Sequence, residues 1–119
     1  MKEKPIEKSI LQYLNAQPDT FAFKVNTVGV FDPVKKVYRK PKSKYLINGV
    51  SDILCQTSLG LIFFEVKSPT GKQTDSQKAF EHNIKRCNGF YYVVRSIEDA
   101  KKALEEIQVR VKATTTTVS

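Results

Sequence analysis

The sequence has little cysteine and histidine: Cys55, Cys87 and His82 are the only residues of these types in 119. A structural zinc site needs a closely grouped set of cysteine and histidine ligands, and a disulfide-stabilised domain of this length carries more cysteines, so both classes are excluded. A single histidine also argues against a Ser-His-Asp hydrolase. The two separated thiols indicate a reducing compartment, which we take to be the cytoplasm.

Long apolar runs are also missing. No stretch of about 18 uncharged apolar residues occurs, so the sequence predicts no membrane-spanning helix. Nor does an apolar signal segment follow the first five residues. Positive charge is abundant instead, because 20 Lys and Arg against 12 Asp and Glu give a net charge of +8, which favours a polyanionic partner. The length fits one domain, which we expect over residues 1–112, followed by a disordered tail over residues 113–119.

The apolar pattern predicts an α/β fold. Apolar residues recur at helical spacing in three segments: residues 5–17, residues 74–87 and the residues from 96 onward. Four runs are typical of strands: residues 21–27, 49–56, 61–67 and 90–94. The helix between the last two of these strands is a crossover, so we expect those strands to be parallel. The prediction is a mixed central sheet with helices on its faces, in the order α-β-β-β-α-β-α.

Two acidic residues, Asp52 and Glu65, interrupt the most apolar strands. If residues 57–60 form a four-residue turn, Leu54 faces Phe63 and Asp52 lies directly opposite Glu65, with Cβ atoms about 5 Å apart. Strand alternation puts Lys67 on the face of Glu65. Two such carboxylates repel each other unless one binds a proton or a cation holds both. Mg²⁺ suits two carboxylates with waters and a backbone carbonyl, for which Val66 is the candidate.

A third acid lies on the first predicted helix. Glu7 falls within its apolar stripe, between Leu14 and Leu11, and would complete a ring of oxygen ligands if the helix packs on the same face of the sheet. Lys67, beside such an ion, would orient an attacking water or stabilise developing charge on a phosphate. The alternative is that Asp52 or Glu65 forms a structural ion pair with Lys67.

Six positive charges fall within residues 35–44, where no acid occurs. This pattern indicates a basic loop or hairpin that projects from the sheet and makes phosphate contacts, with Tyr38 available to stack on an unpaired base. The alternative is a solvated loop without a partner. No base-reading motif occurs, so we expect recognition of backbone and shape. The predicted nucleic-acid-binding residues are Lys35, Lys36, Tyr38, Arg39, Lys40, Lys42, Lys44 and, in a later loop, Lys72.

Three segments together resemble the virus-type replication-repair nuclease (VRR-NUC) domain of the PD-(D/E)xK nuclease superfamily. They are Gly-Val-Ser-Asp at residues 49–52, Glu-Val-Lys at residues 65–67 and Gly-Lys-Gln-Thr-Asp-Ser-Gln at residues 71–77. The resemblance covers most of the chain and implies an α-β-β-β-α-β core with Mg²⁺- or Mn²⁺-dependent phosphodiesterase activity. One departure is Ser51, which stands where the family has proline and would alter the turn into the strand.

The resemblance also implies roles for individual residues. Asp52 and Glu65 would be metal ligands, Lys67 the catalytic lysine, Glu7 the helix acid and Gln77 the motif glutamine. Gln77 has an alternative role, because as the fourth residue of Thr-x-x-Gln it would cap the helix that begins near residue 74.

Free-standing members of the family are similar to phage-encoded endonucleases, some of which cut four-way junctions as dimers. We therefore expect a homodimeric endonuclease for branched DNA, phage-encoded and acting in the cytoplasm of a bacterial host. Two alternatives remain, a non-catalytic basic nucleic-acid-binding module and a basic assembly protein. His82 is expected to be solvated, and Cys55 and Cys87 are expected to be small core residues.

Overall fold

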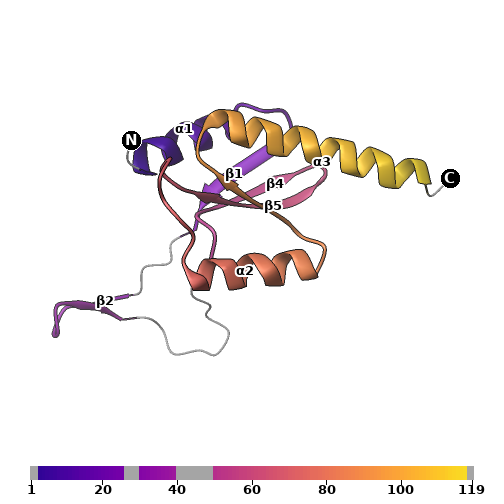
Figure 1. Ribbon diagram of the computed structural model, residues 1–119. Coiled ribbons are helices and arrows are strands. Elements are labelled where there is room, and N and C mark those ends of the chain that lie inside the picture. The colour runs from indigo at the N-terminus through magenta and orange to yellow at the C-terminus, as the bar shows by residue number, and fades with distance from the viewer. Residues whose placement is uncertain (1–2, 26–29, 40–49, 118–119) are drawn as a thin grey trace.

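The computed structural model describes residues 3–25, 30–39 and 50–117. Within these ranges the elements follow the predicted order, with one added hairpin between the first two strands of the sheet (Figure 1). Their bounds are α1 (Glu3–Asn15), β1 (Thr20–Lys24), β2 (Val30–Asp32), β3 (Val37–Arg39), β4 (Ile53–Thr57), β5 (Gly60–Val66), α2 (Asp75–Arg86), β6 (Phe90–Val94) and α3 (Ile97–Thr117). None of the helices in the described part of the chain has the length and apolar character that crossing a bilayer requires.

The main sheet has the strand order β1-β4-β5-β6. Both β1 and β5 pair antiparallel with β4, whereas β5 and β6 are parallel, as the crossover helix α2 predicts. Leu54 pairs with Phe63, so the predicted register is confirmed. The connection is tighter than expected, because Thr57 pairs with Gly60 and leaves a two-residue loop. Gly60 has a φ of 132°, which only glycine adopts readily.

Each face of the sheet has its own helices. In Figure 1, α1 and α3 cover one face and α2 lies against the other. The α1–α3 side holds the largest buried residues, which belong to β4, β5, α1 and α3: Ile53, Phe64, Ile10, Leu14 and Ile107. On the other side Phe80 of α2 meets Phe63 edge-on, with ring centroids 5.5 Å apart. Burial of each such side chain contributes about 1.5–3 kcal/mol to the free energy of folding. Because successive side chains of β5 point to opposite faces of the sheet, this strand supplies residues to both apolar layers.

The ends of α2 follow the expected signals. Thr74 and Gln77 form a capping box at its start. At its end Asn88 has a φ of 63°, and the N–H of Gly89 donates to the Ile84 carbonyl at 2.8 Å. A Cβ at residue 89 would lie 2.6 Å from the Ile84 side chain, so glycine is required at this close approach.

Two expectations differ from the structure. Cys87 is exposed, because it is the C-cap residue beyond the buried face of α2. Cys55 is buried as predicted, and burial raises the pKa of its thiol to about 11. Helix α3 continues through Thr117, so the backbone of residues 113–117 is helical where a disordered tail was expected. Once a helix has formed, each further residue adds a backbone hydrogen bond at little cost, which accounts for the extension. His82 is exposed, as predicted.

Candidate active site

The predicted acids meet where β4 begins and β5 ends. Ile53 pairs with Phe64, and continuing this register by one residue brings Asp52 opposite Glu65. The backbone N–H of Val66 donates to Oδ2 of Asp52 at 2.8 Å, and the N–H of Val25 donates to the Asp52 carbonyl at 3.0 Å. Asp52 is therefore held by both neighbouring strands, with its carboxylate directed at the end of β5.

Glu65 is the most enclosed acid of the site, with no exposed side-chain surface. Its Oε1 accepts a hydrogen bond from the hydroxyl of Tyr91, and its Oε2 has no hydrogen-bond partner among the described residues. Nζ of Lys67 lies 4.0 Å from Oε2. Leaving a buried polar oxygen without a partner costs about 1–3 kcal/mol, so such an atom marks a position where a ligand would be stabilised.

Both carboxyl groups have a pKa above the usual range. Burial raises the pKa of Asp52, and the negative charges of Glu7 and Glu3 raise it further, against the Val66 N–H and Lys67, which lower it. Burial likewise raises the pKa of Glu65, against the Tyr91 hydrogen bond and Lys67. Two carboxylates whose charge is disfavoured by their surroundings are suited to a cation.

The donor set fits one hard divalent ion. The described residues contain no group of three or more Asp, Glu, His or Cys side chains that would hold a metal by themselves. Mg²⁺, however, is commonly held by one or two carboxylates and completes its shell with waters. Asp52, together with the unpartnered Oε2 of Glu65, supplies that minimal set.

Glu7 is not in contact with these two acids. Its carboxylate forms an ion pair with Lys24 of β1 at 2.9 Å, and its side chain is 17% exposed. The hydrogen bond from Lys24 raises the pKa of that lysine. Glu7 is nevertheless close enough to raise the pKa of Asp52. The structure therefore places the helix acid beside the site, with its charge compensated by Lys24.

Gln77 is occupied by the helix cap. Its Oε1 accepts a hydrogen bond from the Thr74 N–H at 2.9 Å, and its own N–H donates to Thr74 Oγ1 at 3.2 Å. The capping interaction that the Thr-x-x-Gln pattern predicts is present. A direct role of Gln77 in chemistry stays a prediction.

Arg95 orders the loop that follows Lys67. One guanidinium nitrogen, Nη1, donates to the carbonyls of Ser68 at 2.6 Å and Gly71 at 2.7 Å. The sequence pattern does not single out this arginine, since it follows β6 and lies far from the loop along the chain. Lys72, which was predicted to bind nucleic acid, is exposed in this loop.

Three further residues were missed: Tyr91, Gln73 and Glu81. Nε2 of Gln73 donates to Glu81 Oε1 at 3.0 Å and lies 3.4 Å from the Tyr91 hydroxyl oxygen, so the chain of contacts continues to Glu65. A signal for Tyr91 was available. In the parallel pairing it lies beside Phe63, on the same face as Glu65, and a buried tyrosine hydroxyl needs a partner.

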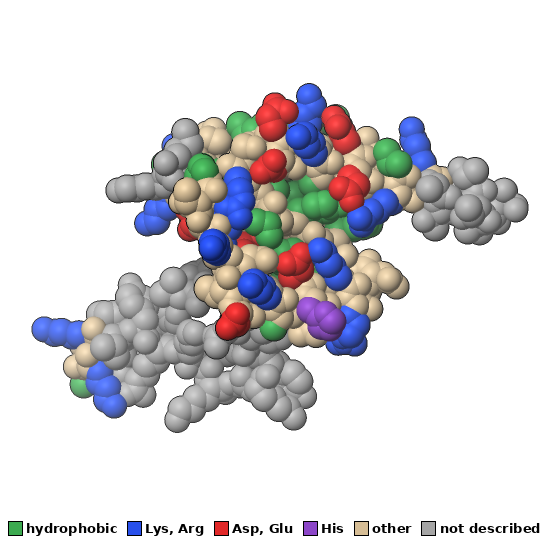
Figure 2. All heavy atoms as spheres, viewed as in Figure 1, with side chains coloured by type: hydrophobic (Ala, Val, Ile, Leu, Met, Phe, Trp, Pro, Cys, Tyr) green, Lys and Arg blue, Asp and Glu red, His purple; other side chains and the backbone are tan. Residues whose placement is uncertain are grey.

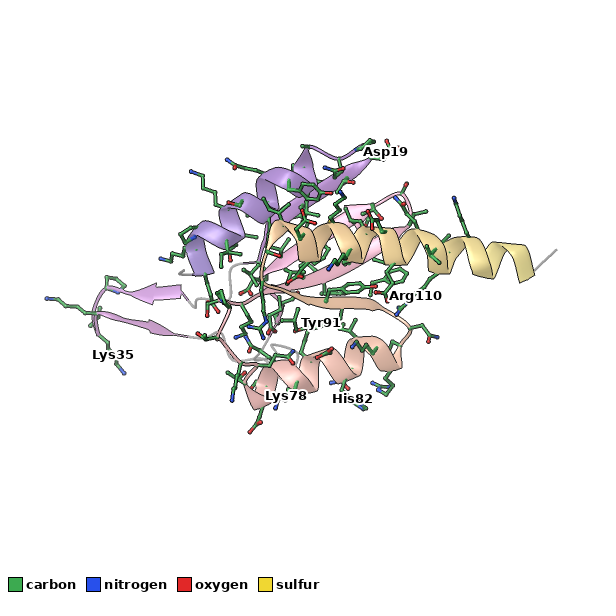
Figure 3. The ribbon with its side chains drawn as sticks, turned by 45° about the horizontal axis from the view of Figure 1, so that its top comes forward. Asp19, Lys35, Lys78, His82, Tyr91 and Arg110 are labelled. Carbon is green, nitrogen blue, oxygen red and sulfur yellow. The ribbon has the colours of Figure 1, made fainter. Side chains whose placement is uncertain are left out.

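The predicted basic stretch forms the β2–β3 hairpin over part of its length. Figure 3 shows Lys35 at the tip of this hairpin, and both Lys35 and Lys36 are exposed. Tyr38 and Arg39 belong to β3, whereas Lys40, Lys42 and Lys44 lie outside the described residues. Of the two forms that the charge pattern allowed, a loop or a hairpin, the described residues form the hairpin, with Lys35 and Lys36 at its turn.

A hollow of about 850 Å³ lies along the outer side of β6, between α2 and α3. Figure 2 shows apolar side chains on its floor and charged side chains along both rims. On the rims, Lys85 pairs with Glu81 at 2.6 Å and Arg110 pairs with Glu106 at 2.5 Å. Because each rim is neutralised internally, the hollow lacks the concentrated positive charge expected for a phosphate site.

The fold is similar to that of a solved structure. It is described as "VRR_NUC domain" and matches this chain with a TM-score of 0.63 at 20% sequence identity. The match covers 88% of this chain and 96% of that chain. No protein-family model matches the sequence, and no curated protein matches it. The chain therefore has the fold of a VRR-NUC domain, and the predicted fold class is confirmed.

Proposed function

We propose that this protein is a metal-dependent endonuclease that hydrolyses phosphodiester bonds in branched DNA. The observation that carries the proposal is the buried Oε2 of Glu65, which lacks a hydrogen-bond partner among the described residues while Lys67 stands 4.0 Å away. The VRR-NUC fold and the net charge of +8 support a nucleic-acid substrate. Four-way junctions are the substrate that we expect first among branched forms.

Asp52 and Glu65 would hold the divalent ion, with the backbone carbonyl of Val66 as a further candidate ligand. A bound Mg²⁺ or Mn²⁺ supplies Lewis-acid polarisation of the scissile phosphate. Lys67 places a positive charge beside the same carboxylate, where it stabilises charge that develops on the phosphate oxygens and orients the attacking water. Glu7 supports the site electrostatically, since its charge acts on Asp52.

The exposed lysines would hold the DNA backbone. Lys35 and Lys36 at the hairpin tip and Lys72 in the loop after β5 are exposed and would make phosphate contacts. Such contacts carry no base information, so the selectivity we propose is for shape. One active site cuts one strand, and resolution of a junction requires two cuts, so we propose that the protein acts as a homodimer.

The test is a panel of labelled four-way junction, flap and duplex DNA, incubated with the protein in Mg²⁺, Mn²⁺ or chelator. We expect metal-dependent cleavage of branched DNA that Lys67→Ala and Glu65→Ala abolish while both variants still bind. Lys101→Ala is the matched control, because Lys101 is an exposed lysine on α3. Undiminished cleavage by Lys67→Ala would contradict the assignment. Salt-sensitive binding without any cleavage would instead identify a non-catalytic nucleic-acid-binding module.

The oligomeric state needs its own measurement. Light scattering on the size-exclusion peak is expected to give twice the mass of the chain without DNA, and that mass plus the mass of one junction when junction DNA is bound. A monomer that cuts both strands of a junction would contradict the homodimer.

A further inference from the structure

The orientation of the Glu65 side chain depends on a residue from a distant part of the chain. The Tyr91 hydroxyl donates to Oε1 of its carboxylate, and the Lys67 ammonium lies 4.0 Å from Oε2. We propose that Tyr91 is a positioning residue, which fixes Oε1 by its hydrogen bond and so presents Oε2 as the ligand atom for a divalent cation. The inference rests on the proposed function, in which Glu65 is a metal ligand.

Tyr91 is rigid enough for this role. Its side chain is nearly fully buried, and its ring packs against Phe80 of α2 with centroids 6.0 Å apart. Its backbone is fixed in β6 beside Phe63 of β5. Figure 3 shows Tyr91 between the sheet and α2, and its hydroxyl contacts Glu65 on this face of the sheet.

The hydroxyl is itself braced. Nε2 of Gln73 lies 3.4 Å from the Tyr91 oxygen and 3.0 Å from Oε1 of Glu81, whose other oxygen pairs with Lys85 at 2.6 Å. Burial raises the pKa of Glu81, but the hydrogen bonds from Lys85 and Gln73 outweigh it, so the pKa is lowered and Glu81 stays ionised. A continuous chain of contacts therefore runs from the surface at Lys85 to Glu65.

In the pair of Tyr91 and Glu65, the tyrosine is the donor and the carboxylate is the acceptor. A phenol is protonated at neutral pH, so the Tyr91 hydroxyl donates to Oε1 of Glu65. A glutamate with one oxygen held cannot rotate freely, and so it loses less side-chain entropy when the other oxygen binds an ion. Groups that orient a metal ligand in this way typically change metal affinity by about 10–100-fold when they are removed.

The test compares two tyrosines that are neighbours on the same strand. Tyr91→Phe removes the hydroxyl that contacts Glu65 and keeps the ring. Tyr92→Phe is the control, because Tyr92 lies on the opposite face of β6, where Glu106 and not Glu65 acts on its hydroxyl. Mn²⁺ binding is measured calorimetrically without DNA, and melting curves in chelator check the fold.

We expect Tyr91→Phe to bind Mn²⁺ about 10-fold more weakly than the wild type, and Tyr92→Phe to bind it like the wild type. Cleavage by Tyr91→Phe is expected to need more Mn²⁺ but to recover at saturating metal, which a role in packing alone would not produce. If Tyr91→Phe does not fold, Gln73→Met replaces it, because this change removes the brace on the hydroxyl and is expected to weaken Mn²⁺ binding in the same direction.

Equal Mn²⁺ affinity in the wild type and a folded Tyr91→Phe would overturn the inference and leave the nuclease proposal intact. Equal affinity in the wild type and Gln73→Met, where Tyr91→Phe does not fold, would overturn it as well. A wild-type protein that binds no Mn²⁺ and cuts no DNA would instead overturn the proposed function, and this inference with it.

Discussion

Nζ of Lys67 lies 4.0 Å from Oε2 of Glu65, and both side chains are almost completely enclosed. This separation is the outer limit for an ion pair and is too long for a hydrogen bond. Lys67 therefore compensates the buried carboxylate only in part, which agrees with the raised pKa of Glu65. The arrangement leaves Oε2 of Glu65 without a hydrogen-bond partner among the described residues, at a cost in stability that the rest of the fold offsets.

A divalent ion is expected to stabilise the folded protein. Metal at about 100 times its dissociation constant should add about 2.7 kcal/mol to the free energy of unfolding, because the ion binds only the folded site. Urea unfolding with Mg²⁺, Mn²⁺ or chelator measures the gain. Asp52→Asn and Glu65→Gln should lose it, whereas Glu105→Gln, which changes an exposed acid on α3, should keep it. An equal gain in all four proteins would point to binding elsewhere.

The metal-free protein is expected to become more stable on mild acidification through these two acids. Burial raises the folded pKa of Asp52 and Glu65 above unfolded values of about 3.9 and 4.3. The folded state therefore binds protons more readily, so this contribution grows as the pH falls through the raised pKa values and is complete below the unfolded ones. Unfolding of wild type and Glu65→Gln in chelator, compared across pH, should show a flatter profile for the variant. A steeper dependence of the free energy of unfolding on pH in the variant would contradict the predicted sign of this contribution.

The two roles of Gln77 separate in a comparison with Thr74. Each residue holds the other's backbone N–H in the capping box, so Thr74→Ala and Gln77→Ala should each lower the free energy of unfolding by about 1 kcal/mol. If Gln77 also acts in chemistry, Gln77→Ala should cut DNA more slowly than Thr74→Ala at equal stability. Cleavage rates of both variants, measured below their melting temperatures, test this. Equal rates would show that Gln77 acts only as a helix cap.

The hairpin tip is expected to contribute to DNA binding through charge alone. Lys35→Gln and Lys36→Gln should each weaken binding to all DNA forms alike and reduce the slope of log affinity against log salt by about 1. Fluorescence anisotropy over a salt series gives the slope. Lys101→Gln, a change of equal charge on α3, should leave the slope unchanged. A selective loss for one DNA shape would show that the tip reads structure.

The sequence was sufficient for the elements that depend on local signals. Alternation along two apolar strands and a short turn fix the pairing of Leu54 with Phe63, and this pairing brings Asp52 and Glu65 together. The Thr-x-x-Gln cap and the Asn-Gly end of α2 likewise depend on neighbouring residues. The crossover rule then gave the direction of β6.

Contacts between distant segments could not be predicted in the same way. The pairing of Glu7 with Lys24 depends on how α1 crosses β1, and helical spacing contains no information on that crossing. The contacts of Arg95 with Ser68 and Gly71, and of Tyr91 with Glu65, form across the parallel pair β5–β6. Their register is set by packing of α2, because no short turn joins the two strands.

Strand β6 has an uncharged sequence, Phe-Tyr-Tyr-Val-Val, and it lies at one edge of the main sheet, opposite the edge formed by β1. Such an edge is a template for unwanted pairing with another polypeptide. Here the two flanking helices narrow access to it, and Lys85 and Arg110 stand on the rims as gatekeeper charges. Substitutions that weaken the packing of α3 would therefore expose the edge of β6 and cause aggregation before they changed the geometry of Asp52 and Glu65.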